Sequence, residues 1–265
     1  MFNGLVQVNV ELSSRCNKSC AICGRREREK IYGNQNYGDM DFEILRIISN
    51  QLPIGTIIAL HNNGEALLYP RLGEAITLLK NRGYYVYTVS NGKLLMEKYG
   101  EIVNNLDQIS ISVIENDNPE EKELQYNILK RFIETKKDKA PFTVLRFVGD
   151  IKDEERYLNL GLPIVRRTVH LPKGSVGYRK EPTKPEFLVC WDLMSRLAIN
   201  RFGDISLCVR FDPDGELVLG NVKTSSLRGA WSHPKRLNTI NNMIAGKRIG
   251  FCETKCQFWG IPTGN

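Results

Sequence analysis

The sequence predicts an α/β protein: a partial (β/α)6 TIM-like barrel followed by a small C-terminal unit with a β-hairpin and helices. In the first 170 residues, short apolar runs alternate with amphipathic stretches, which is typical of parallel strands joined by crossover helices. The six strands expected there are too few for a closed eight-unit barrel, which needs about 250 residues. Nearer the C-terminus, short strands separated by turn residues predict a hairpin.

The barrel strands are expected where apolar or alternating runs are bounded by turn residues. Leu5–Leu12 alternates apolar and polar residues, whereas Thr56–Leu60 (TIIAL) is mostly apolar and fits a buried strand. Apolar residues at helical spacing predict the helices between the strands. The other strands are Tyr84–Val89, Gln108–Val113, Phe142–Phe147 and Pro163–Thr168, and the helices are Asp41–Gln51, Arg71–Arg82, Leu94–Asn104 and Glu120–Lys136.

A change in composition at Leu171–Pro185, which holds three prolines and two glycines, marks the expected domain boundary. We therefore assign residues 1–170 to the barrel and residues 171–265 to the second unit. The second unit is expected to contain strands at Leu197–Asn200, Ile205–Val209 and Glu216–Leu219, and helices at Leu227–Trp231 and Arg236–Ile244.

Composition excludes several classes of protein. Of the 265 residues, 42% are apolar and 25% are charged, which argues against a largely disordered chain. No signal peptide and no apolar run of about 20 residues is present, so we expect a cytoplasmic protein without a membrane partner. The net charge of +7 favours anionic partners only weakly. The basic runs are short and interrupted by acids, so nucleic acid is not expected to bind.

Three of the seven cysteines, Cys16, Cys20 and Cys23, form a C-x3-C-x2-C pattern directly after the first strand. An odd number of cysteines argues against a plain disulfide framework. Three thiolates in one loop can hold three corners of a [4Fe–4S] cluster and leave one iron without a protein ligand. A structural zinc site would need a fourth ligand, and no histidine is close in the sequence. Zinc binding and a thiol redox role remain alternatives.

This cysteine loop resembles that of the radical S-adenosylmethionine (SAM) enzymes. The resemblance implies that the open iron binds SAM, that reductive cleavage of SAM yields a 5′-deoxyadenosyl radical, and that Ile22 lies near the adenine. Asn63-Gly64-Glu65-Ala66 stands where the family carries a Gly-Gly-Glu-Pro-like motif, and it departs from that motif at Asn63 and Ala66. The resemblance makes Asn63, Gly64 and Glu65 candidates for SAM binding, with Glu65 near the amino group.

Further candidates follow on the next two strands. Ser90-Asn91-Gly92 matches the family's Thr-Asn-Gly position, which makes Asn91 a candidate for cofactor binding. Ser110 and Ser112 alternate on the fourth strand and so point to the same side. The family often uses a serine there for the ribose or carboxylate of SAM, although either serine could instead be a small packing residue.

Arg146 and His61 are the candidates for catalysis. Arg146 is a charge inside an apolar run and needs a partner. A carboxylate of SAM or of the substrate would bind it in a bidentate way, and a protein salt bridge is the alternative. His61 follows the second strand, and it lies with Arg146 and Tyr87 near strand ends, where barrel active sites are built. The alternative for His61 is a loop histidine that hydrogen-bonds to the backbone.

The remaining cysteines are spread over the last third of the chain. We expect Cys190 before the hairpin, Cys208 on its second strand, and Cys252 and Cys256 on a final loop. Four thiolates could bind zinc or a second [4Fe–4S] cluster. With Leu219-Gly220-Asn221, Ser226-Leu227 and Trp231, they resemble the abbreviated twitch form of the SPASM domain, which implies an auxiliary iron–sulfur cluster. Architecture and length are similar to those of the small aminocyclitol dehydrogenases of butirosin biosynthesis.

The division of seven cysteines into three and four favours oxidation. A fully ligated auxiliary cluster is suited to accepting an electron, and no thiol remains to return a hydrogen atom, although a tyrosine could. The first hypothesis is therefore the dehydrogenation of a polar small molecule such as a sugar or aminocyclitol. The alternatives are oxidation, cross-linking or epimerisation of a peptide or protein side chain, and a zinc-stabilised nucleic-acid binder without catalysis. The resemblance also implies a flavodoxin- or ferredoxin-like electron donor.

Overall fold

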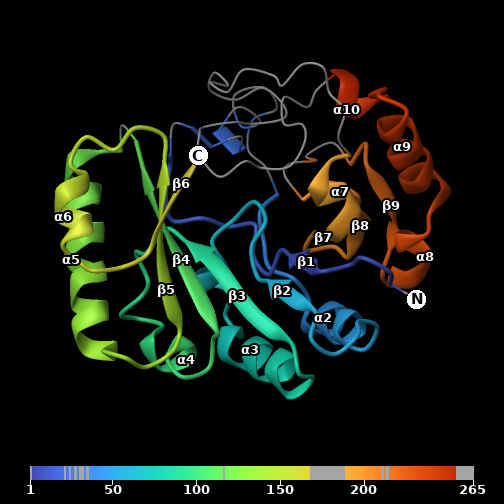
Figure 1. The fold of residues 1–265 in the computed structure, drawn as a ribbon. Helices are drawn as coiled ribbons and strands as arrows, with labels where there is room; N and C mark the ends of the chain where they lie inside the picture. Colours follow the sequence, from blue (N-terminus) through green and yellow to red (C-terminus); the bar gives the residue numbers. More distant parts are fainter. Residues whose placement is uncertain are drawn as a thin grey trace.

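A single sheet organises the chain, with the strand order β6-β5-β4-β3-β2-β1-β7-β8-β9 (Figure 1). The structure is a computed structural model. It describes residues 2–20, 22–23, 25–26, 29, 33, 36–115, 117–167, 189–209, 212 and 215–254. Neighbouring strands from β6 to β7 are parallel, whereas β8 and β9 are antiparallel to their neighbours.

All six expected barrel strands are present, and within the described residues the sheet does not close on itself, which confirms the α/β class and the partial barrel. Each strand coincides with its predicted range to within a few residues, and in β1 to β5 the apolar residues that predict the strand are also largely buried. The bounds are β1 Gln7–Val10, β2 Ile57–Ala59, β3 Tyr85–Ser90, β4 Gln108–Ile114, β5 Phe142–Val148 and β6 Ile164–Arg167, then β7 Arg196–Ile199, β8 Asp204–Ser206 and β9 Val218–Asn221.

The helices also follow the predicted order, with one clear difference. The expected helix over Leu94–Asn104 is reduced to α4, Tyr99–Ile102. Left-handed backbone at Gly92 (φ 82°) and Asn104 (φ 64°) turns the chain on either side of it. The short helices are too brief to show apolar residues repeated at helical spacing, so the sequence did not predict them. The others are α2 Phe42–Ser49, α3 Leu72–Asn81, α5 Pro119–Lys136, α6 Glu154–Leu158, α7 Trp191–Ser195, α8 Leu227–Trp231, α9 Pro234–Ile244 and α10 Phe251–Thr254, with a 3₁₀ turn at Ala66–Leu68.

The two faces of the barrel sheet differ in polarity. Side chains that point toward the helices are apolar and fully buried, as Val8, Ile58 and Ile109 illustrate. Side chains on the other, concave face include polar residues such as Gln7 and Asn9 on β1. Because side chains alternate along a strand, a polar concave face and an apolar convex face arise from the same alternating sequences. The hydrophobic core therefore lies on the helical side, and the concave side is left for a site.

The C-terminal unit continues the same sheet. β7 pairs in parallel with β1, with Arg196 opposite Gln7. Two further contacts hold the unit in place: the indole N–H of Trp231 donates to the Asn3 carbonyl at 3.1 Å, and the Leu227 N–H donates to the Gln51 side chain at 2.8 Å. The expected boundary near residue 170 falls within residues 168–188, outside the described residues. Within the described part of the chain, no helix has the length and apolar character needed to cross a membrane.

The α5 helix offers a direct test of the core. Phe132 is fully buried and packs edge-on against Tyr99, whereas Leu124 on the same helix is 51% exposed. We expect Phe132→Ala to lower the free energy of unfolding by about 3–5 kcal/mol, because a large buried side chain is lost. Leu124→Ala should change it by less than about 0.5 kcal/mol. Urea denaturation of both variants measures the difference, and equal effects would contradict the assigned packing.

Candidate active site

The cysteine loop leaves β1 and passes close to the loop that follows β2. A Cβ atom on Gly64 would lie 2.0 Å from the Ser13 carbonyl oxygen and 2.7 Å from that of Arg15. The Glu65 N–H donates to the same Arg15 carbonyl at 2.7 Å. Only glycine permits this approach, so Gly64 fixes the position of the chain that enters Cys16.

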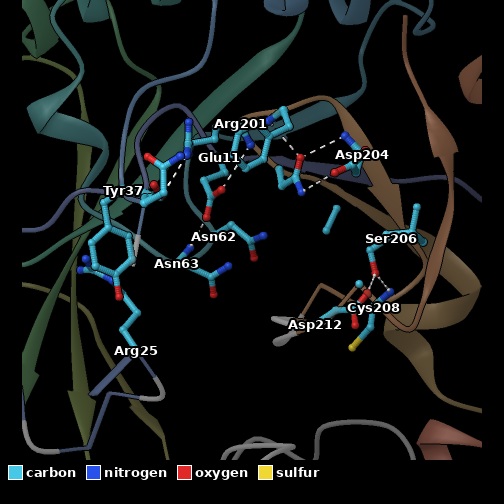
Figure 2. Close-up of a pocket in the computed structure, with 17 residues that line it drawn as sticks. Glu11, Arg25, Tyr37, Asn62, Asn63, Arg201, Asp204, Ser206, Cys208 and Asp212 are labelled. Atoms are coloured by element: carbon cyan, nitrogen blue, oxygen red, sulfur yellow. Dashed lines mark hydrogen bonds between the residues drawn. The ribbon is translucent and has the colours of Figure 1, made fainter. Parts of the chain in front are cut away.

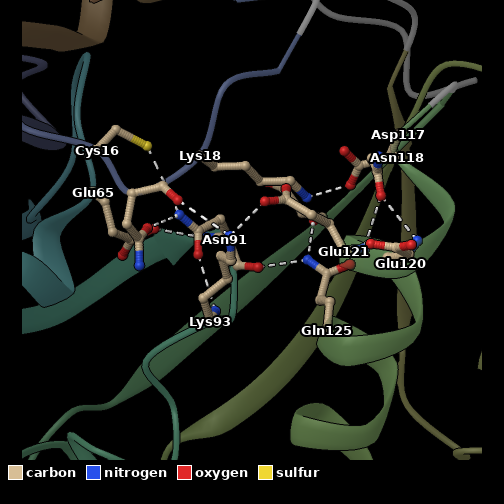
Figure 3. A network of polar contacts seen from close by, with 12 residues as sticks. Cys16, Lys18, Glu65, Asn91, Lys93, Asp117, Asn118, Glu120, Glu121 and Gln125 are labelled. Carbon is tan, nitrogen blue, oxygen red and sulfur yellow. Dashed lines mark hydrogen bonds and ion pairs between the residues drawn. The ribbon is translucent and has the colours of Figure 1, made fainter.

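Glu65 joins the β2 loop to the β3 loop (Figure 3). It is 2% exposed, and its carboxylate accepts backbone N–H groups from Leu67 at 3.1 Å and Asn91 at 2.8 Å. Burial raises the pKa of this carboxyl group, and the hydrogen bonds oppose that rise. Both oxygens therefore already bind the protein, which gives Glu65 a structural role whatever else it contacts.

Asn91 reaches from the end of β3 into the cysteine loop. Its side-chain amide donates to the Asn17 side chain at 2.7 Å and lies 3.8 Å from the Cys16 sulfur. Gln125 on α5 donates to the Asn91 carbonyl and to the Ser112 carbonyl, so the position of Asn91 is itself fixed. Sequence reasoning selected Asn91, and the structure brings it to the first cysteine.

A buried ion pair also holds the cysteine loop. The Lys18 ammonium, in the loop between Cys16 and Cys20, pairs with Asp117 after β4, and their side chains are 1% and 7% exposed. Lys93 adds a second link, because it donates to the Asn17 carbonyl at 3.2 Å and pairs with Glu121 at 2.7 Å. No sequence pattern connects these distant partners, and sequence reasoning missed them.

The thiols of the cysteine loop are protonated unless a metal binds and displaces their protons. Burial raises the pKa of Cys20 to about 12, an effect that Lys18 opposes, and burial also raises the pKa of Cys23. Metal binding would therefore release protons from this loop. Among the described residues, no three His, Cys, Asp or Glu side chains converge on one ion-sized point. Thiolates that each bind a different iron need no such convergence, so the donor set fits a cluster. Ile22 lies in the turn between Cys20 and Cys23.

A cavity of about 670 Å³ opens on the concave face of the sheet. It contains three of the expected residues, His61, Ser110 and Arg146, together with Tyr87. Ser112 shares the face of Ser110 and stands opposite Arg146 in the β4–β5 register. The structure thus brings the candidates from β2, β4 and β5 to one face.

His61 is held as a neutral ring. Its Nδ1 atom accepts the Val89 N–H at 3.3 Å, so the remaining proton is on Nε2. Burial, reinforced by Arg146 and Arg196, lowers the pKa of His61 to about 3. The ring also packs edge-on against Tyr87, with centroids 5.3 Å apart. His61 is therefore suited to donating a hydrogen bond from Nε2 and poorly suited to accepting a proton.

A second cavity, of about 450 Å³, lies between the cysteine-loop side of the barrel and the C-terminal hairpin (Figure 2). Glu11, at the end of β1, is 5% exposed and accepts N–H groups from Asn63 at 3.3 Å and Arg201 at 3.2 Å. Asn63 lines this cavity rather than the concave one, and Asn62 lines both. Sequence reasoning missed Glu11, although the alternation along β1 could have placed it on the concave side.

The C-terminal cysteines differ from expectation in their local structure. Cys208 lies beyond β8, not on it: the register with β9 shifts between Ile205 and Ser206, the last residue of β8, and the Ser206 hydroxyl accepts the Cys208 N–H at 3.3 Å. Cys252 is on the short helix α10 and not on a loop. Cys190 immediately precedes α7, and Cys256 lies outside the described residues.

Gly64 gives the first prediction for this site. Gly64→Ala should displace the cysteine loop, because backbone atoms surround the new methyl group. The loss of unfolding free energy should be no smaller than that of a typical overpacked core, about 1–3 kcal/mol. Iron bound after anaerobic reconstitution and the melting temperature measure the effect. Gly100→Ala is the control, since nothing lies within 4 Å of its added Cβ. Wild-type iron content in Gly64→Ala would refute this account.

The buried ion pair between Lys18 and Asp117 gives the second prediction for this site. Lys18→Met should cost about 3–5 kcal/mol of unfolding free energy, because Asp117 is left buried and unpaired. The double variant Lys18→Met/Asp117→Leu should recover much of that loss. Lys122→Met is the matched control: its partner Asp153 is 39% exposed, so about 0–1 kcal/mol is expected. Denaturant titration measures all three, and equal costs for Lys18→Met and Lys122→Met would be inconsistent with a buried pair.

Comparison with known proteins identifies the C-terminal unit. Residues 190–257 match SPASM, an iron-sulfur cluster-binding domain. The tungsten-containing aldehyde ferredoxin oxidoreductase cofactor-modifying protein of Pyrococcus furiosus is 27% identical over 108 residues, which are 40% of this chain. That alignment covers 28% of the relative, so this chain matches less than a third of the relative's length.

Solved structures match over most of the chain. BtrN in complex with AdoMet and 2-DOIA has a TM-score of 0.59 and 14% identity, covering 91% of this chain and 88% of BtrN. Native anSMEcpe with bound AdoMet and a peptide has a TM-score of 0.65 and 15% identity. The match covers 96% of this chain and 88% of anSMEcpe. The chain has the fold of the radical SAM enzymes and carries a C-terminal SPASM-type iron–sulfur cluster-binding domain.

Proposed function

We propose that this protein is a radical SAM oxidoreductase that dehydrogenates a polar small molecule. In this proposal Cys16, Cys20 and Cys23 hold a [4Fe–4S] cluster with one open iron, to which SAM binds. The observation that carries the proposal is the position of the three-cysteine loop, which Gly64 and Asn91 hold at the carboxyl ends of β2 and β3. Asn62, in the same loop as Gly64, lines the concave cavity. Active sites of barrel enzymes are built at that end of the strands.

When bound, the cluster and SAM supply a 5′-deoxyadenosyl radical that removes a hydrogen atom from the substrate. The chain's own residues position the reactants. Ser110 and Arg146 contribute polar groups on the concave face, and the Nε2–H of His61 donates to an oxygen there. The structural role of Glu65 leaves the backbone of the Asn63–Glu65 loop as the better candidate for contact with SAM.

We propose that the C-terminal cysteines would hold an auxiliary [4Fe–4S] cluster, which would supply an acceptor for the second electron. Cys190, Cys208, Cys252 and Cys256 supply four thiolates, and the SPASM match over residues 190–257 includes all four. Removal of a hydrogen atom from a carbinol carbon, followed by loss of a proton and an electron, gives a ketone. A flavodoxin- or ferredoxin-like protein is proposed as the electron donor to the first cluster.

Modification of a peptide side chain is the second candidate. The solved structure of anSMEcpe with a bound peptide supports it, because that protein shares this fold over most of its length. The same cluster-binding residues would serve either substrate. Product analysis with small polyols and aminocyclitols, compared with peptides, separates the two.

Variants of the two cysteine groups test the proposal. Anaerobic reconstitution should load about eight iron atoms per chain, four for each cluster. Cys16→Ala should hold about half of that iron and form no 5′-deoxyadenosine with SAM and dithionite. Cys208→Ala should also lose about half of the iron but still form 5′-deoxyadenosine, and it should lose net oxidation of the substrate.

Two results would contradict the proposal. If Cys16→Ala still cleaved SAM reductively, the assignment of the SAM-binding cluster to this cysteine loop would be wrong. Stoichiometric zinc with no iron in the wild-type protein would favour a structural metal site and no radical chemistry.

A further inference from the structure

A side-chain amide of the β3 loop donates to a sulfur of the cysteine loop (Figure 3). The Asn91 amide nitrogen lies 3.8 Å from Cys16 Sγ and 2.7 Å from Asn17 Oδ1. An amide nitrogen carries two hydrogens, so each acceptor can take one of them. Both side-chain donors of Asn91 are therefore directed to the start of the cysteine loop, and one of them is directed to a sulfur.

The groups around this amide fix its orientation. Asn91 is 9% exposed, and its Oδ1 atom accepts the Lys93 N–H at 3.0 Å. If the amide were turned over, two donors, its NH2 group and the Lys93 N–H, would face each other. The Asn91 backbone is also held, because its N–H donates to Glu65 at 2.8 Å and its carbonyl accepts from Gln125. The side-chain N–H group therefore stays aimed at the sulfur.

A donor at this sulfur changes the energy of a bound cluster. In the proposed function Cys16 holds an iron of the SAM-binding cluster, and its sulfur carries part of the cluster's negative charge. Reduction adds one electron, so a nearby N–H group stabilises the reduced cluster more than the oxidised one and raises the reduction potential. Because Asn91 is buried, water screens this interaction little.

We propose that Asn91, acting through Cys16, raises the reduction potential of the SAM-binding cluster. This inference rests on the proposed function and adds a residue that controls how readily the cluster takes an electron from the proposed donor protein. Since both side-chain N–H groups of Asn91 are already engaged, its role is toward the cluster. The nearby pair of Lys18 and Asp117 carries no net charge, and variants of Asn91 leave it in place.

Asn91→Leu tests the proposal, because leucine has nearly the shape of asparagine but no side-chain N–H group. The midpoint potential is measured by electron paramagnetic resonance on reconstituted protein poised at a series of potentials. The SAM-binding cluster is the one whose signal changes when SAM is added. At a fixed potential, its ratio of oxidised to reduced form should rise about fivefold, the size of one neutral hydrogen bond. At about 59 mV per tenfold for one electron, this lowers the midpoint potential by about 40 mV.

Asn17→Ala is the matched control. It removes the other partner of the Asn91 side chain, and so loosens the loop, but it leaves the N–H group at Cys16. Its ratio of oxidised to reduced cluster should stay within about twofold of wild type. Asn91→Ala removes the same donor as Asn91→Leu without adding bulk, and it should shift the potential in the same direction. Iron content is measured for every variant.

Three results would overturn the proposal. They are an unchanged potential in both Asn91 variants at wild-type iron content, an equal shift in Asn17→Ala, and loss of the cluster from both Asn91 variants, which would make Asn91 purely structural. Each of these leaves the proposed function standing. Failure of the proposed function appears instead in the wild-type protein, as absence of 5′-deoxyadenosine and of any cluster signal that responds to SAM.

Discussion

The close contact between two backbones at Gly64 is the constraint on which the rest of the site depends. β1 and β2 are parallel neighbours, so their carboxyl ends emerge side by side, and the chain segments that follow meet at Gly64. Glu65 extends this contact to β3 through Asn91. The cysteine loop is thus positioned by the sheet beneath it and needs no regular secondary structure of its own.

The division of the sheet into an apolar and a polar face separates stability from chemistry. Burial of apolar side chains supplies the main favourable free energy of folding, and in the barrel strands residues such as Val8, Ile58 and Ile109 bury it on the convex side, against the helices. The concave face is consequently free to carry histidine, tyrosine, serine and arginine side chains. Such a face can change its polar groups with the substrate while the core on the other side stays the same.

Local sequence patterns were sufficient to predict the barrel strands and their parallel arrangement, because the alternation of apolar runs and amphipathic stretches is a local property. The candidates His61, Ser110 and Arg146 could be selected because each is a polar residue in or next to an apolar strand. Contacts between distant residues could not be predicted. Lys18 and Asp117 are 99 positions apart, and Glu11 and Arg201 are 190 positions apart, with no pattern that links them. The hydrogen-bonding state of His61 likewise depends on the register of β2 and β3.

The pairing of β7 with β1 means that the two halves of the chain share hydrogen bonds through a common sheet. If the C-terminal unit were removed, β1 would become an edge strand with unpaired backbone groups, next to the cysteine loop. Exposed edges of this kind promote aggregation by pairing with other chains. The SPASM-type unit therefore acts as a cover for the barrel edge, so losing it would affect solubility as well as cluster content.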